Sequence, residues 1–256
     1  RRIHHSLISR GLGYDYDPIQ NELGFFPFRE IEMQQIDKLV INSKWGQNLV
    51  KKLYPSYAKK VDYSYLGLPD PKRLNPINQT TTFHIVSCSY VIELKRIHLI
   101  IEILKHVKFP VKWTHIGEGP LLKEIKTLTG ELPDNVVAEF TGFIPSVIDF
   151  YKTAPCDLFI TTTRTEGLPF SLAEAIAHGI PVMGTAVCGI PEIINESTGF
   201  LIERDFEPGH AAEIINNYYL MPHDAKLQLR KTARMYFEKN FTAEKNVPDF
   251  VDKYLS

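Results

Sequence analysis

The chain has 256 residues, which allows one large or two modest domains. Its 29 basic and 30 acidic side chains nearly cancel, so no overall field favours nucleic acid or an anionic membrane. The three cysteines lie far apart in the sequence, which argues against a disulfide framework and for a reducing, cytoplasmic compartment. The first residue is Arg1 rather than Met, so we expect a processed chain or a fragment.

The first 69 residues are expected to contain little regular structure. A helix is predicted over residues 29–40, running into an apolar stretch at 39–41, and a second helix over 44–53, capped by Asn42 or Ser43. Residues 61–66 are predicted as a strand, and the polar, proline-rich residues 70–79 as a linker. Turn-forming residues predict loops before residue 31, at Gly11, Gly13, Asp15, Asp17, Pro18, Gly24 and Pro27.

From residue 83 onward, short apolar stretches alternate with segments of helical periodicity. Strands are predicted over residues 83–88, 111–116, 136–141, 158–162, 181–184 and 200–202. Helices are predicted over 95–107, 121–128, 147–152, 171–178, 191–195, 210–220, 223–238 and 242–255. This order predicts a parallel sheet covered by helices on both faces, with a ligand beyond the carboxyl ends of its strands.

The segment 157–182 carries the most specific pattern. A predicted strand ends near residue 162, a loop carries Glu166 and Gly167, and a predicted helix starts after Pro169 and ends at Gly179. The free amides at such a helix start form an anion site, and Glu166 and Glu174 flank it. A nucleotide sugar fits this layout, because its diphosphate lies between two sets of hydroxyl groups.

A purely structural interpretation of the same residues stays open at this point. Ser171 and Glu174 also match a capping box, in which the glutamate only satisfies an amide at the helix start. Glu166 could equally be a solvated loop acid, and Lys95 a solvated lysine at a helix start.

Several motifs together resemble glycosyltransferase family four, whose members have the GT-B fold. The Glu166–Glu174 pair is similar to the family's Glu-x7-Glu motif, and Gly189-Ile-Pro-Glu-Ile-Ile with Thr198-Gly-Phe-Leu-Ile to its next loop, helix and strand. His115-Ile-Gly-Glu-Gly-Pro resembles a Gly-x-Gly-Pro turn, and Phe140-Thr-Gly-Phe-Ile the strand and loop that pass the base. The resemblance covers about residues 38–240, and residues 38–69 resemble the end of the family's first domain.

The resemblance implies a role for individual residues. Glu174 would bind the ribose diol, and Glu166, the candidate catalytic residue, would bind hydroxyls of the donor sugar. Lys95 matches a basic residue that neutralises the diphosphate, whereas Tyr90 stands where the family usually has arginine, so the phosphate clamp is expected to be weaker or completed differently. The other implied donor-binding positions are Gly117, Phe143, Gly167, Leu168, Phe170 and Ser171.

The expected fold class is therefore α/β: a Rossmann-like parallel sheet with helices on both faces, as in the GT-B C-terminal domain, preceded by a partial N-terminal domain. We expect an acceptor-side remnant over 1–69, a nucleotide-sugar-binding domain over 70–240 and a helix over 241–256 that crosses back. Phe241, Val247, Phe250 and Tyr254 would then be exposed, packed on residues 1–66 or buried in a dimer.

The implied function is that of a retaining glycosyltransferase, or its donor-binding fragment, which moves a hexose-type sugar from a UDP- or GDP-sugar to a glycan or lipid-linked acceptor. No metal is expected, because no Asp-x-Asp metal motif is recognised and Lys95 with a helix dipole can carry the phosphate charge. Partners would include a missing N-terminal domain or a second copy, with peripheral association at the inner face of the membrane and no nucleic acid.

Three other functions compete with this one. A GT-B-type epimerase or a non-catalytic nucleotide-sugar-binding module would keep the same donor site. A dinucleotide-dependent oxidoreductase would need a glycine-rich loop after the first strand, and the loop after Cys88 has none. A chain without a full acceptor domain is expected to bind donor but to transfer sugar poorly.

Overall fold

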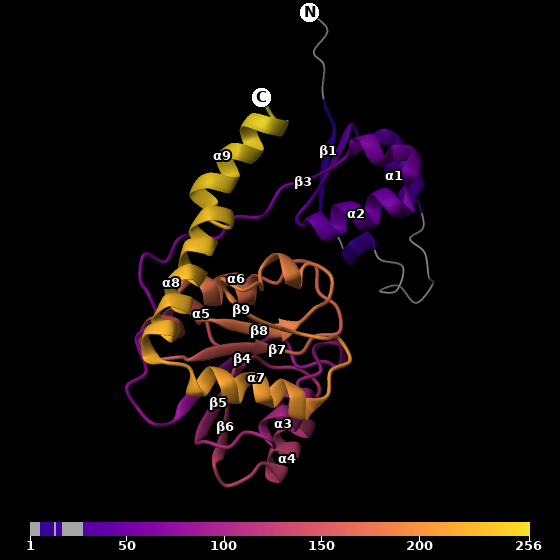
Figure 1. The fold of residues 1–256 in the computed structure, drawn as a ribbon. Helices are drawn as coiled ribbons and strands as arrows, with labels where there is room; N and C mark the ends of the chain where they lie inside the picture. The colour runs from indigo at the N-terminus through magenta and orange to yellow at the C-terminus, as the bar shows by residue number, and fades with distance from the viewer. Residues whose placement is uncertain (1–5, 13, 17–27) are drawn as a thin grey trace, which may run out of the picture.

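The computed structural model describes residues 6–12, 14–16 and 28–256, and in that part the chain forms a small and a large parallel sheet (Figure 1). The predicted loop residues Gly13, Asp17, Pro18, Gly24 and Pro27 lie outside the described residues.

The small sheet has the strand order β1-β2-β3 and is entirely parallel. Its strands and helices are β1 (Ile8–Gly11), η1 (Tyr14–Tyr16), α1 (Arg29–Gln35), β2 (Lys38–Ile41), α2 (Lys44–Leu53), η3 (Pro55–Lys60) and β3 (Val61–Tyr63). The helix predicted over 29–40 is therefore too long, since it ends at Gln35, and the strand at 8–11 was predicted as loop.

The ammonium group of Lys60 explains where α1 ends. It donates to the carbonyl oxygens of Met33, Gln34 and Ile36 at 2.8–3.0 Å, so it satisfies the last carbonyls of the helix. Leu39 and Ile41 then extend into a buried cluster shared with the rest of this segment, which favours a strand over a longer helix. At the next helix, the Ser43 hydroxyl accepts from the Gly46 amide and caps α2, as predicted.

The large sheet has the order β6-β5-β4-β7-β8-β9, and all its pairings are parallel. Its strands are β4 (Phe83–Cys88), β5 (Val111–Ile116), β6 (Val136–Gly142), β7 (Leu158–Thr161), β8 (Val182–Thr185) and β9 (Gly199–Ile202). The helices between and after them are η4 (Glu93–Lys95), α3 (His98–Leu104), α4 (Leu122–Leu128), η5 (Thr129–Glu131), α5 (Val147–Thr153), α6 (Phe170–Ala177), η6 (Ile190–Glu192), α7 (Pro208–Leu220) and α8 (His223–Asn240). The six predicted strands thus match the six observed ones, with ends that differ by at most one residue.

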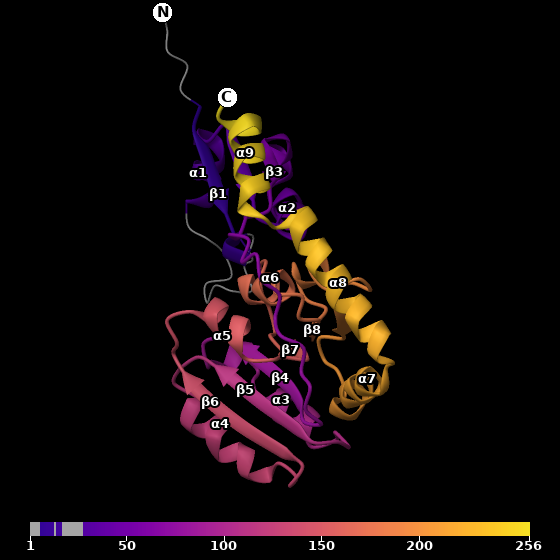
Figure 2. The same cartoon turned by 90° about the vertical axis from the view of Figure 1, so that its left-hand side faces the viewer.

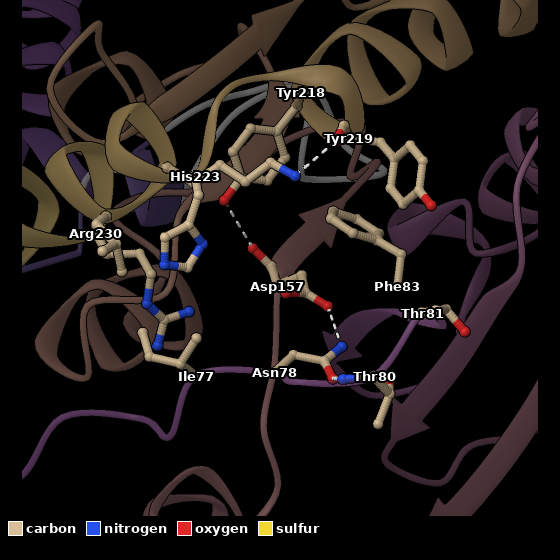
Figure 3. Close-up of a pocket in the computed structure, with 12 residues that line it drawn as sticks. Ile77, Asn78, Thr80, Thr81, Phe83, Asp157, Tyr218, Tyr219, His223 and Arg230 are labelled. Carbon is tan, nitrogen blue, oxygen red and sulfur yellow. Dashed lines mark hydrogen bonds between the residues drawn. The ribbon is translucent and has the colours of Figure 1, made fainter.

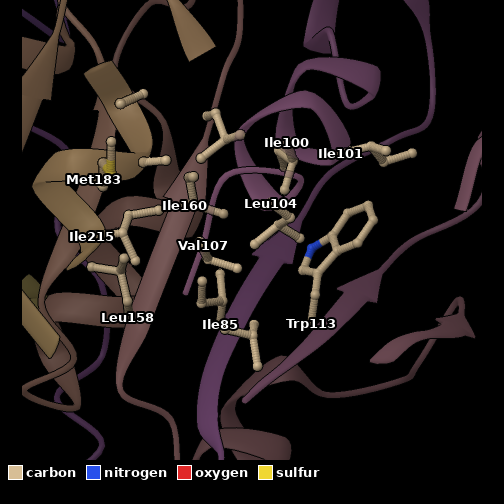
Figure 4. Close-up of a cluster of buried hydrophobic side chains, with 14 of the residues drawn as sticks. Ile85, Ile100, Ile101, Leu104, Val107, Trp113, Leu158, Ile160, Met183 and Ile215 are labelled. Atoms are coloured by element: carbon tan, nitrogen blue, oxygen red, sulfur yellow. The ribbon is translucent and has the colours of Figure 1, made fainter. Parts of the chain in front are cut away.

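Two apolar cores lie on opposite faces of the large sheet. Alternate residues of a strand point to opposite faces: Leu158 and Ile160 pack against α3, α4 and α7, whereas Phe159 packs against α5, α6 and α8. Figure 4 shows the first core, in which the fully buried Trp113 lies beside α3. Burial on both faces holds the strands in register and fixes the positions of the loops at their carboxyl ends.

The chain crosses between the two sheets twice, and the crossings pair with each other. The Leu68 amide donates to the Phe241 carbonyl at 2.8 Å, and the Ala243 amide donates to the Leu68 carbonyl at 2.9 Å. Helix α9 (Ala243–Tyr254) then runs alongside the small sheet (Figure 2).

Of the three placements expected for this helix, the structure has the one against the N-terminal residues. Arg10 lies 4.4 Å from the centre of the Phe250 ring, the Tyr254 hydroxyl donates to the Tyr63 carbonyl, and Phe241 is buried, while Val247 stays exposed.

Candidate functional site

The predicted site residues lie in loops that follow neighbouring strands, at the carboxyl end of the large sheet. Phe143 follows β6, Gly117 follows β5, Tyr90 follows β4 and Glu166 follows β7. Three strand spacings separate β6 from β7, which corresponds to about 14 Å across the carboxyl end of the sheet. An extended ligand lying along these loops could therefore contact all of them at once.

Helix α6 begins beside the β7 loop with a free N-terminus. Pro169 is its N-cap residue and Phe170 its first residue, and no side chain caps it. Ser171 is therefore inside the helix rather than at its cap, so the capping box with Glu174 does not form. The uncapped amides leave this end open to an anionic group, and the buried Leu168 anchors the loop beneath it.

Lys95 and Glu166, which are 71 residues apart, form an ion pair. Both side chains are 21% exposed, so the pair lies at the surface of the site and a ligand can reach either charge. An anionic ligand would compete with the Glu166 carboxylate for the Lys95 ammonium group. The Lys95 charge is neutralised by Glu166 in the unliganded chain and would be released to an anionic ligand when Glu166 moves away.

The loops that carry these two residues are fastened together. The Thr162 hydroxyl donates to the Arg96 carbonyl at 2.9 Å, and the Arg96 Nε donates back to the Thr162 carbonyl at 2.8 Å. The Arg164 amide donates to the Leu94 carbonyl at 2.9 Å. Arg96 has a left-handed backbone with φ of 47°, and its guanidinium group donates to the carbonyl oxygens of Thr162 and Arg204.

The Glu174 carboxylate lies half-buried on the first turns of α6 and accepts no hydrogen bond from any other described residue. Burial raises its pKa above the ordinary 4.5. Burial also raises the pKa of the nearby Cys88 thiol to about 12, and the Glu174 charge acts in the same direction. A half-buried carboxylate without a partner is free to accept hydrogen bonds from a ligand's hydroxyl groups.

Two exposed aromatic rings and a tight glycine turn also lie in the loops at the carboxyl end of the large sheet. Phe143 is 73% exposed and Tyr90 is 60% exposed, so both rings can be contacted by a ligand. Gly117 has φ of +139°, and a Cβ there would lie 2.0 Å from the Ser89 carbonyl oxygen, so only glycine lets the two loops approach. The Glu118 carboxylate accepts from the Phe143 amide at 3.2 Å and holds that loop in place.

Residues 188–192 contain the Gly-Ile-Pro-Glu motif, but none of them was predicted as a site residue. A Cβ at Gly189 would lie 1.9 Å from the Gly167 carbonyl oxygen, so this segment packs directly on the loop that carries Glu166. Cys188 has φ of 49°, and its thiol lies 3.2 Å from the Thr165 hydroxyl. The loop that carries Glu166 is therefore in contact with residues that follow β8.

A metal site is not formed by the described residues. No group of three or more His, Cys, Asp or Glu side chains among them could hold an ion. The expectation that the sequence has no Asp-x-Asp is wrong, because Asp15 and Asp17 form one in the N-terminal segment. Asp17 is outside the described ranges, and the Asp15 carboxylate accepts from the Leu12 amide at 3.1 Å.

A separate cavity of about 120 Å³ lies at the other end of the large sheet (Figure 3). Its polar groups bond to one another: the Asp157 carboxylate accepts from the Asn78 side-chain amide at 2.6 Å and from the His84 backbone amide at 2.8 Å, and its carbonyl accepts from Tyr218. These bonds stabilise the fold around the cavity, which does not belong to the candidate site.

Among the helices of the described ranges, none is long and apolar enough to span a bilayer.

The family profile described as "Glycosyl transferases group 1" matches residues 73–236, more than half of the chain and all of the site loops. The chain belongs to the group 1 glycosyl transferases.

Curated relatives of this group 1 transferase are distant. The chain is 27% identical over 219 residues to WcaL of Escherichia coli (strain K12), whose name places it in colanic acid biosynthesis, and the match covers 80% of this chain and 53% of WcaL. It is 30% identical over 174 residues to the amylovoran biosynthesis glycosyltransferase AmsK of Erwinia amylovora, covering 62% of this chain and 41% of AmsK. The chain thus spans about half the length of the curated relatives it matches.

Solved structures show the same fold. HepE of Anabaena, crystallised in complex with UDP and glucose, superposes with a TM-score of 0.79 at 17% identity, covering 98% of this chain and 72% of HepE. WaaG, a glycosyltransferase involved in lipopolysaccharide biosynthesis, superposes with a TM-score of 0.70 at 19% identity, covering 86% and 63%. The predicted α/β fold of GT-B type is confirmed.

Proposed function

We propose that this chain is the donor-binding half of a retaining glycosyltransferase that uses a UDP-hexose. The observation that carries the proposal is the uncapped N-terminus of α6, flanked by the Lys95–Glu166 pair and the unpartnered Glu174. UDP as the nucleotide is favoured by HepE, a structural neighbour whose crystals contain UDP and glucose.

In this proposal the ligand lies along the carboxyl edge of the large sheet. The base stacks on the exposed Phe143, and Glu174 accepts hydrogen bonds from the ribose hydroxyls. The diphosphate lies on the amides of α6, and Glu166 turns from Lys95 to the hydroxyls of the sugar.

The chemistry requires charge to develop on the leaving diphosphate. The free Lys95 ammonium group and the α6 dipole stabilise that charge where it forms, which is the role that a metal ion has in other transferases. Transfer without a metal and with retention of the anomeric configuration are therefore parts of the proposal.

The acceptor is proposed to be a glycan or a lipid-linked sugar, used on the cytoplasmic side of a membrane. Support comes from the names of AmsK and of WaaG, which refer to amylovoran and lipopolysaccharide biosynthesis. The acceptor would lie beside the N-terminal segment, because Gly189 packs on the loop that carries Glu166 and Glu192, three residues later, contacts the amides of Lys44 and Trp45.

Isothermal titration of this chain with UDP-, GDP- and ADP-glucose tests the donor class. We expect UDP-glucose to bind most tightly, and no binding of any of the three would refute the proposal. Product analysis with and without an oligosaccharide acceptor then separates the competing functions. A changed sugar without acceptor indicates an epimerase, binding without any product a non-catalytic module, and an α-linked product from an α-linked donor a retaining transferase.

Transfer by this chain alone is expected to be slow. Among the described residues, the small sheet has three strands and offers little wall against which an acceptor could be held. Positioning of both reactants contributes a large part of the catalysis of a two-substrate reaction. Turnover on the order of 1 s⁻¹, an ordinary enzyme rate, by the 256-residue chain would contradict this expectation.

A further inference from the structure

The carboxylate of Glu192 reaches across from the large-sheet domain to the N-terminal segment. Its two oxygens accept three hydrogen bonds: from the Lys44 amide at 2.9 Å, from the Trp45 amide at 2.7 Å and from the Tyr65 hydroxyl at 2.8 Å. All three donors are more than 120 residues away in the sequence. No other described carboxylate makes so many bonds between the two parts of the chain.

These bonds cap helix α2 from outside. Ser43, the N-cap residue, satisfies the Gly46 amide, and Glu192 satisfies the first two amides of the same ten-residue helix. A negative charge at a helix N-terminus is favoured by the helix dipole as well as by the hydrogen bonds. Burial, followed by the Glu192 charge, raises the pKa of Tyr65, so its hydroxyl remains a donor at neutral pH.

The backbone of Glu192 is tied to the donor loop and to α8. The Tyr236 hydroxyl of α8 donates to the Glu192 carbonyl at 2.9 Å. Three residues before Glu192, Gly189 packs against the Gly167 carbonyl, and its amide lies 3.4 Å from the Glu166 carbonyl. A movement of the donor loop would therefore pass along a short rigid segment to the α2 N-terminus.

We propose that Glu192 is a positioning residue that docks the N-terminal segment on the donor-binding domain and couples this docking to occupancy of the donor site. The docking follows from the three bonds alone. The coupling also rests on the proposed function, because it requires a nucleotide beside Glu166 and Gly167. A substitution at Glu192 is then expected to loosen the domain contact and to leave the donor site itself intact.

The two tryptophans of the chain provide a direct probe. Trp45 is half-exposed at the docking contact, whereas Trp113 is fully buried in the large-sheet core, so acrylamide quenches mainly Trp45. We expect the quenching constant to rise at least twofold in Glu192→Ala, less in Glu192→Gln, which keeps one acceptor oxygen, and least in Tyr65→Phe, which removes one of three bonds. Glu196→Gln, at an exposed glutamate four residues away, is the matched control and should equal the wild type.

A second measurement separates positioning from a general effect on the fold. We expect UDP to change the Trp45 emission of the wild type and this change to be lost in Glu192→Ala and Glu192→Gln; no change in the wild type would refute the coupling. Because coupling is reciprocal, UDP affinity should fall in both variants by the factor by which UDP favours docking in the wild type. A residue that supports only the docking contact would raise quenching but leave UDP affinity and the UDP-induced emission change as in the wild type.

The quenching series tests the docking role of Glu192, and the UDP titration tests its coupling to the donor site. Quenching that is unchanged in Glu192→Gln and Glu192→Ala refutes the docking role, and Glu192→Gln decides alone if the alanine variant does not fold. A UDP-induced emission change that persists in both variants refutes the coupling. If UDP does not bind the wild type, the proposed function and the coupling fail together, but the quenching series still decides the docking.

Discussion

Replacing Glu174 by glutamine is expected to move donor affinity and fold stability in opposite directions. The substitution keeps the size of the side chain and one acceptor oxygen but removes the charge. In the empty site the carboxylate is half-buried and has no partner among the described residues, and its pKa is raised by burial. The charge therefore disfavours the unliganded fold and is useful only when a ligand's hydroxyl groups are present.

The magnitude follows from the bonds that would be lost. Hydrogen bonds to a charged group contribute about 1.5–3 kcal/mol, which corresponds to a roughly 10- to 150-fold weaker UDP affinity in Glu174→Gln. The melting temperature of the unliganded variant should stay equal to that of the wild type or rise. For the wild type, affinity should fall as the pH is lowered through the raised pKa of Glu174, above 4.5, and this pH dependence should be absent from the variant.

Isothermal titration with UDP from pH 7 down to pH 5 and thermal unfolding without ligand measure both effects. Glu124→Gln, at an exposed glutamate on α4, is the control and should change neither. Unchanged UDP affinity combined with a lower melting temperature in Glu174→Gln would mean that this carboxylate serves only to stabilise the start of α6.

Three further predictions follow from the geometry. Gly189→Ala should destabilise the fold by about 1–3 kcal/mol and weaken UDP binding, because a Cβ there would lie 1.9 Å from the Gly167 carbonyl oxygen. Gly130→Ala is the control and should change neither property, because a Cβ at Gly130 meets nothing within 4 Å. Equal stability and equal UDP affinity of the two variants would contradict this prediction. Burial lowers the pKa of His115 from 6.5 to about 4, so between these pH values the unfolded chain binds more protons than the folded one. The free energy of unfolding should therefore fall by about 3 kcal/mol from His115 alone as the pH drops from 6.5 to 4. Urea unfolding at pH 7 and 4.5 should show this loss, and an unchanged free energy of unfolding would refute it. UDP binding and any transfer should be unchanged in excess chelator, and strict dependence on a divalent ion would rule out charge neutralisation by Lys95 and α6 alone.

The sheet that carries the site was predictable because its pattern is local. Each strand of the large sheet is a short apolar stretch, and the helices between them have their own periodicity, so no distant contact was needed to locate them. The small sheet was less predictable. Ser9 and Arg10 are polar, and β1 exists only because it pairs with residues 38–41, which the sequence alone presents as the continuation of a helix.

The same distinction applies to the site. Glu166, Glu174 and Lys95 could be named from motif and loop position, but the ion pair between Lys95 and Glu166 joins loops 71 residues apart, and the absence of a capping box depends on where α6 begins. The observed start at Phe170 differs by only one residue from the predicted start at Ser171, within the uncertainty of any boundary set by propensity. The bonds of Glu192 join residues 127–148 positions apart, and no periodicity or spacing could indicate them.

The paired crossings at Leu68 and Thr242 have a mechanical consequence. Two covalent connections that run side by side, joined by two backbone hydrogen bonds, act as a single pivot rather than as two independent tethers. Such a pivot permits bending but resists sliding and twisting, so the small sheet and α9 must swing as one lever. A Cβ at Gly67 would lie 2.3 Å from the Ala243 Cα, which shows how little room the pivot contains. Any change in the angle between the small and the large sheet would therefore be set at this pairing of Leu68 with Phe241 and Ala243.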